Sequence, residues 1–257
     1  MRRSGCLGRR SERGALAASE NLCAAITSWT TTAPWSSGRW KLRRRPNLSF
    51  SPPSVRKTRL PQLSEFSHAP ASDFCLTDAD MLLFVDVVRL GNLCGLRVLE
   101  LSRTNDGESV GRVGMEALMG AVVESEEGLP LLESLNLTGT RAGEGAPALG
   151  TALMSGKLTK LSDIYLSESA LTDQGLRGLE DAVRGGGFVN VVRLSLGDNW
   201  GVEGRVWTEF MRAIAESERG MPKMEWLGLS YTNASKEAVS VALGSGKLPS
   251  LKEVIAD

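Results

Sequence analysis

Three side chains of types that often contact a partner protein lie about thirty residues apart in the sequence. Asp163, Arg193 and Trp226 are separated by 30 and 33 positions, and Tyr165 lies two residues after Asp163. A carboxylate, a guanidinium and aromatic rings form ion pairs, hydrogen bonds and cation–π contacts, and Trp, Tyr and Arg dominate many protein–protein interfaces. This chemistry is binding rather than bond-making. It requires a scaffold that places positions thirty residues apart side by side.

The segment Gly150–Thr159 (GTALMSGKLT) departs from the phosphate-binding loop that it superficially matches. Such a loop needs G-x-x-x-x-G-K-[ST], in which backbone amides surround the phosphate and the hydroxyl binds magnesium. Here the glycines are one residue too far apart, and Leu158 replaces the hydroxyl residue. The Gly-Lys pair returns at positions 246–247, which indicates a glycine that ends a helix. We therefore expect no nucleotide cofactor.

The sequence lacks side chains arranged for acid–base catalysis or for metal binding. The single histidine, His68, lies before the repeats described below, so no Ser-His-Asp set can be assembled. The four cysteines, at positions 6, 23, 75 and 94, form no CxxC pair, which favours free thiols in a reducing compartment over a zinc site or a disulfide framework. We expect no catalytic residue, no metal and no cofactor, and hence no enzyme.

An internal repeat indicates the scaffold. The heptapeptide Ser155–Leu161 (SGKLTKL) returns 90 positions later as SGKLPSL. The frame L-x-x-L-x-L, closed by Asn, Thr or Ser, occurs five times and begins a sixth time, with first positions at Leu96, Leu132, Leu161, Val191, Met224 and Leu251. Alternation at L-x-L predicts a short strand with inward leucines. The closing residue is expected to bond the backbone at the turn, and only Asn199 brings an amide.

Between these frames the apolar spacing changes to the i, i+3, i+7 pattern of a helix. The triplets are Met115, Leu118 and Val122; Ala146, Leu149 and Leu153; Leu176, Leu179 and Val183; and Trp207, Phe210 and Ile214. Each unit is thus predicted to be one strand and one helix, which bury their apolar sides only by stacking. A partial unit at Leu76-Thr77-Asp78, which mirrors Leu171-Thr172-Asp173, extends the domain to residues 74–257.

These frames resemble leucine-rich repeats of the ribonuclease-inhibitor type, a branch that includes repeat domains of NOD-like receptors and Ran GTPase-activating proteins. The resemblance implies an α/β solenoid, a horseshoe segment of about five full repeats with parallel strands on the concave face and helices on the convex face. It implies a protein-binding module that acts as an adaptor, scaffold or sensor. Alternatives are a GTPase activator, although the additional repeats and acidic tail of those relatives are missing, and a fragment of a larger receptor-like protein.

On this scaffold, residues between the core leucines face the concave side. The predicted partner-binding surface comprises neighbouring strand positions and two residues of the strand-to-helix loops: Asp163, Tyr165, Arg193, Trp226, Asp198 and Tyr231. With strands about 4.8 Å apart, an exposed Trp226 would lie beside Arg193. This arrangement is either an interface hot spot or an in-sheet salt bridge with a cation–π contact that needs no ligand, and both interpretations stay open.

Charge is divided sharply along the chain. Residues 76–257 carry 17 Lys/Arg against 26 Asp/Glu, a net charge of −9, whereas residues 1–75 carry 13 against 4, a net charge of +9. The acidic repeats predict a basic protein partner and argue against nucleic acid. No apolar stretch is long enough to span a bilayer, so we expect no membrane association and an intracellular, cytoplasmic protein.

Residues 1–73 are rich in Arg, Ser, Thr and Pro and lack an apolar period, which favours disorder. The same composition is typical of an organelle transit peptide, and the run Lys41–Arg45 (KLRRR) is typical of a nuclear localisation signal. A mis-predicted first exon would give the same pattern. The nucleus or an organelle therefore stays open as an alternative location.

The last predicted strand carries Leu251, Val254 and Ala256 into a layer that no further helix covers. Solenoids need end units with a polar outer face, and an uncovered strand leaves backbone groups unpaired. We therefore expect self-association through this strand.

Overall fold

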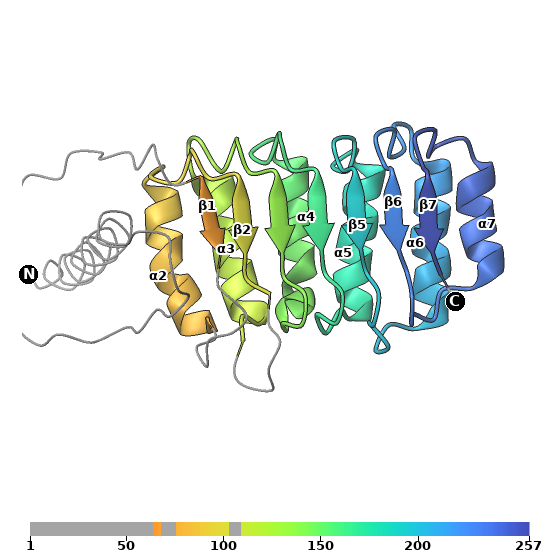
Figure 1. Ribbon diagram of the computed structural model, residues 1–257, viewed down its shortest axis with the longest axis horizontal. Helices are drawn as coiled ribbons and strands as arrows, with labels where there is room; N and C mark the ends of the chain where they lie inside the picture. The colour runs from red at the N-terminus through yellow and green to blue at the C-terminus, as the bar shows by residue number, and fades with distance from the viewer. Residues whose placement is uncertain (1–63, 68–75, 103–108, 257) are drawn as a thin grey trace, which may run out of the picture.

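The computed structural model describes residues 64–67, 76–102 and 109–256, which form one sheet of seven parallel strands (Figure 1). Neighbouring strands in the sheet follow one another in the chain, so the sheet grows by one strand per unit. The strands are β1 (Glu65–Ser67), β2 (Val98–Glu100), β3 (Ser134–Asn136), β4 (Asp163–Tyr165), β5 (Arg193–Ser195), β6 (Trp226–Gly228) and β7 (Glu253–Ile255). The predicted parallel α/β architecture with repeating units is confirmed.

Among the described residues, helices cover one face of this sheet and none lies on the other face (Figure 1). They are α2 (Asp78–Arg89), α3 (Arg112–Glu124), α4 (Ala146–Met154), α5 (Asp173–Arg184), α6 (Gly204–Glu216) and α7 (Lys236–Gly244), with a short 3₁₀ helix, η1 (Ala142–Gly145), leading into α4. Each helix connects two successive strands, and successive helices pack on one another. Because strands and helices alternate along the chain, the spacing of apolar residues alternates between the two-residue period of a strand and the 3.6-residue period of a helix.

The core lies between the sheet and the helices. The central residue of each strand from β2 to β6 is buried, and these residues are in register across the sheet: Leu99, Leu135, Ile164, Leu194 and Leu227. All twelve residues of the four predicted helical triplets are buried opposite them. The predicted inward direction of both patterns is therefore confirmed within the described residues.

The sheet begins earlier than the sequence analysis placed it. Strand β1 pairs with β2 in the register Phe66 to Leu99, although it lies inside the segment 1–73 predicted to be disordered. Phe66 follows Leu63 with the L-x-x-L spacing, but His68 stands where the third leucine of the frame belongs. This substitution hid the strand from pattern reading. The remaining predictions for residues 1–63, including the transit-peptide and nuclear-signal alternatives, lie outside the described residues.

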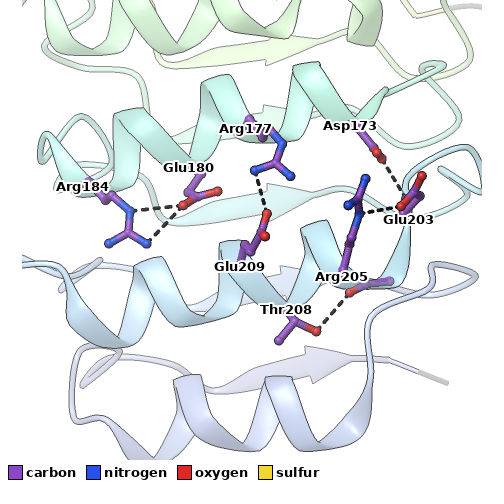
Figure 2. A network of polar contacts seen from close by, with 9 residues as sticks. Asp173, Arg177, Glu180, Arg184, Glu203, Arg205, Thr208 and Glu209 are labelled. Atoms are coloured by element: carbon purple, nitrogen blue, oxygen red, sulfur yellow. Dashed lines mark hydrogen bonds and ion pairs between the residues drawn. The ribbon is translucent and has the colours of Figure 1, made fainter.

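The repeated Leu-Thr-Asp sequence links successive units through its last two side chains. Thr77 caps α2, because its Oγ1 accepts the amide N–H of Asp80, while Oδ1 of Asp78 accepts the N–H of Gly111 in the next unit at 2.6 Å. Thr172 caps α5 in the same way, and Oδ1 of Asp173 accepts the N–H of Glu203 at 2.8 Å (Figure 2). Each Asp thereby satisfies a free amide at the start of the following helix.

Ion pairs tie neighbouring helices together on the outer surface. Nη1 of Arg177 on α5 lies 2.7 Å from Oε2 of Glu209 on α6, a contact drawn in Figure 2. Arg184 lies between Glu180 of its own helix and Glu216 of α6. Exposed pairs of this kind contribute between nothing and about 1 kcal/mol each. They align the helices, but the buried leucines supply most of the stability.

We expect the C-terminal unit to open before the centre of the sheet. Val241 and Leu243 on α7 are 58% and 46% exposed, and Val254 of the edge strand β7 is only partly buried. Fewer buried apolar contacts lower the free energy of local opening. Amide hydrogen exchange should therefore be much faster in residues 239–256 than in residues 135–196. Equal protection of both regions in a protein that stays monomeric at high concentration would contradict this expectation and the predicted self-association.

Candidate functional site

The uncovered face of the sheet brings together the strand residues that the sequence singled out. Asp163, Arg193 and Trp226 occupy paired positions on β4, β5 and β6, and Tyr165 lies two positions further along β4. In each strand from β2 to β6 the central residue points into the core, so its two neighbours point toward the open face. The predicted column of side chains is therefore present.

Arg193 and Asp163 form an ion pair within the sheet. Nη1 of Arg193 lies 3.3 Å from Oδ1 of Asp163, whose side chain is 19% exposed, whereas that of Arg193 is 52% exposed. Attraction to Asp163 raises the pKa of the Arg193 guanidinium above its usual value. Burial raises the pKa of the Tyr165 phenol, and the charge of Asp163 adds to the effect while Arg193 opposes it. Tyr165 therefore stays a neutral hydrogen-bonding group near neutral pH.

Trp226 is half-buried, which corrects the expectation that it is exposed. A Cβ atom added to Gly228 would lie 2.5 Å from Cη2 of Trp226, so the indole lies over the glycine of its own strand. The missing side chain at Gly228 makes room for the ring. Among the described residues no cation–π contact joins Trp226 to Arg193, so the ion pair predicted for the sheet is present without the aromatic contact.

Other polar side chains on this face also pair with one another. Nδ2 of Asn136 donates to Glu100 across two strands at 2.9 Å, and the Ser167 and Ser195 hydroxyls are 2.5 Å apart. This face consequently offers an ordered polar surface rather than a deep pocket.

Asp198 and Tyr231 lie beyond the ends of β5 and β6, in the turns that lead toward the helices. They are neighbours, because the N–H of Asp198 donates to the carbonyl of Ser230 at 2.9 Å. Both adopt positive φ angles, 56° and 54°, as does Glu168 in the turn after β4 at 53°. The strands are only three residues long, so these side chains form a second surface at the edge of the sheet.

Trp200 belongs to this second surface, and the sequence analysis missed it. Its side chain is 64% exposed, and its ring centroid lies 5.9 Å from that of Tyr231, which is 54% exposed, at an interplanar angle of 33°. One signal was available: Trp200 directly follows the closing residue Asn199, where other described units have Arg141, Ala170 and Asn233. A large aromatic at a turn position that is otherwise small or polar indicates an exposed ring.

A depression of about 390 Å³ lies beside Trp200. It is lined by residues of η1, of the turns after β4 and β5, and of the start of α5, namely Glu144, Ala170, Leu171, Thr172, Asp198, Asn199, Trp200 and Gly201. We call Glu168, Asp198, Trp200, Tyr231 and this depression the loop-edge surface.

Within residues 64–67, 76–102 and 109–256, no cluster of three or more His, Cys, Asp or Glu side chains is arranged to hold a metal ion. None of the described helices combines the length and apolar character needed to cross a membrane. No known protein family matches the chain, and no curated protein is significantly similar to it.

Proposed function

We propose that residues 64–256 form a leucine-rich-repeat solenoid of the ribonuclease-inhibitor type that binds a protein partner on the sheet face not covered by helices. The strand order, the single helix per strand and the frame spacing of about 30 residues support the repeat identity. In such a solenoid the sheet forms the concave face and the helices form the convex face.

One observation carries the binding function. An open face of parallel strands displays Arg193, Asp163, Tyr165 and Trp226 side by side, with aromatic rings and charges held in place by neighbouring strands. Rigid anchors of this composition dominate protein interfaces, because little entropy is lost when they are contacted. The net charge of −9 over residues 76–257 favours a basic protein partner over nucleic acid.

Affinity capture with the full chain tests this proposal. Arg193→Ala and Trp226→Ala should each weaken binding of the captured partner by about thirtyfold, the effect of losing an interface hot spot. Arg112→Ala, which removes an exposed arginine on α3, should leave capture unchanged and serves as the matched control. Thermal melting of each variant separates lost contacts from lost folding. An identical captured set for the wild type and both strand variants would refute binding through this face.

A further inference from the structure

We propose that the loop-edge surface binds an arginine side chain on a basic segment of a partner protein. This inference rests on the proposed function and deepens it, since it specifies the chemistry of the partner. It concerns residues in the turns at the edge of the sheet, whereas the capture experiment tests residues on the strands.

The aromatic pair provides the first contact. Trp200 contacts Tyr231 and also lines the depression, so one ring takes part in both features. Two large aromatic side chains that are 64% and 54% exposed are costly to leave in water. A guanidinium ion gains from stacking on an indole face through its flat shape and its charge, and tryptophan is the strongest of the aromatic partners.

Two carboxylates provide the charge. Asp198 and Glu168 are exposed, and no ion pair joins either of them to a cation among the described residues. Arg141 in the turn after β3 pairs with Glu144 at 2.7 Å, and Arg205 at the start of α6 pairs with Glu203 at 2.6 Å. The loop-edge surface therefore has unneutralised negative charge beside its aromatic rings.

The backbone holds these groups next to one another. The N–H of Glu168 donates to the carbonyl of Gly197 at 3.0 Å, and the N–H of Asp198 donates to that of Ser230 at 2.9 Å. The three turns are therefore stacked like the strands, about 4.8 Å apart. The Asn199 side chain contributes to the depression but is engaged with backbone groups, so Asp198 and Trp200 are the residues that a ligand meets.

An anion is a poorer occupant of the same place. The N-terminus of α5 opens toward the depression through Thr172, and a helix N-terminus attracts negative charge. That turn already has its own carboxylate in Asp173 and its own cap, because Oγ1 of Thr172 accepts the N–H of Gly175 at 3.0 Å. Asp198 and Glu168 would repel a further anion.

Fluorescence anisotropy with a labelled peptide in which arginine alternates with glycine and serine tests the proposal on the full chain. Trp200→Ala should weaken binding about two- to fivefold, as expected for loss of one exposed cation–π contact. The double variant Glu168→Gln with Asp198→Asn should weaken it by at least as much, and Asn suits the positive φ of Asp198. A peptide with lysine in place of arginine should bind several-fold more weakly.

The matched control removes the same charge elsewhere. The double variant Asp181→Asn with Glu218→Gln neutralises two exposed carboxylates, one near the C-terminus of α5 and one just after the C-terminus of α6. It should leave binding unchanged. Equal loss in this control, equal binding of an acidic peptide, or no loss in Trp200→Ala would overturn the proposal.

An intramolecular occupant would also overturn the proposal. Binding seen only after Arg43, Arg44 and Arg45 are changed to serine would identify the chain's own basic segment as the occupant. None of these outcomes depends on Arg193 or Trp226, so capture through the strand face is judged separately.

Discussion

Replacing Asn199 by alanine is expected to lower the free energy of unfolding by about 3–5 kcal/mol. The side chain is 2% exposed and joins two units: Nδ2 donates to the carbonyls of Leu166 and Leu196, both at 2.8 Å, and Oδ1 accepts the N–H of Leu171 at 3.0 Å. Alanine would leave buried backbone groups without partners, each costing about 1–3 kcal/mol before water enters. Chemical denaturation measures the change.

Two further variants provide reference values for this loss in the free energy of unfolding. Asn190→Ala removes an exposed amide that donates to the Thr159 carbonyl, and it should cost less than about 1 kcal/mol. Asn199→Ser should lie between the two, because Ser169 in the preceding unit donates only to Leu166, three residues earlier in its own turn. Equal stability of Asn199→Ala and Asn190→Ala would show that the amide is not the link between the units.

The hydrogen bonds of Asn199 and the other frame-closing residues could be predicted from the sequence. An amide at a frame-closing position has both a donor and an acceptor, so bonding to two turns follows from its chemistry and the repeat register. Thr140 and Thr232 have a hydroxyl, and each donates to the carbonyl three residues earlier in its own unit. Local bonds of this kind follow from residue type and spacing, and the sequence was sufficient to predict them.

Side-chain exposure on the open face was harder to predict, because it depends on neighbours that the frame does not specify. Trp226 occupies an outward position as predicted, yet it lies over Gly228 and is half-buried. Asp198 and Tyr231 were predicted to lie in the strand-to-helix loops and to extend the surface that contains Arg193, and both lie in those turns. The ring contact between Tyr231 and Trp200 was not predicted, because it depends on packing between two turns that the frame does not specify.

The close approach of α4 and α5 is a second feature that no periodic pattern reveals. A Cβ atom on Gly150 would lie 2.2 Å from the carbonyl oxygen of Gly178, and one on Gly178 would lie 2.4 Å from Cα of Pro147. Both glycines occur on helix faces where alanine would satisfy the apolar pattern equally well. Only the packed structure shows that the two backbones touch at this point.

Gly178→Ala is expected to destabilise the protein by about 2–3 kcal/mol, as overpacking of a close contact does. The new methyl group would meet the backbone of Pro147, which cannot rotate away as a side chain can, so α4 and α5 must separate. Better helix propensity offsets only about 1 kcal/mol of this cost. Thermal and chemical denaturation should show the loss, and amide exchange should rise first in α4 and α5.

Gly120→Ala is the matched control, because nothing lies within 4 Å of a Cβ atom at Gly120 inside α3. There the same substitution should stabilise the protein by about 0.5–1 kcal/mol through helix propensity alone. If Gly178→Ala lowers the free energy of unfolding and Gly120→Ala raises it, the loss at Gly178 comes from the contact between α4 and α5. Stabilisation by both would show that these helices do not touch.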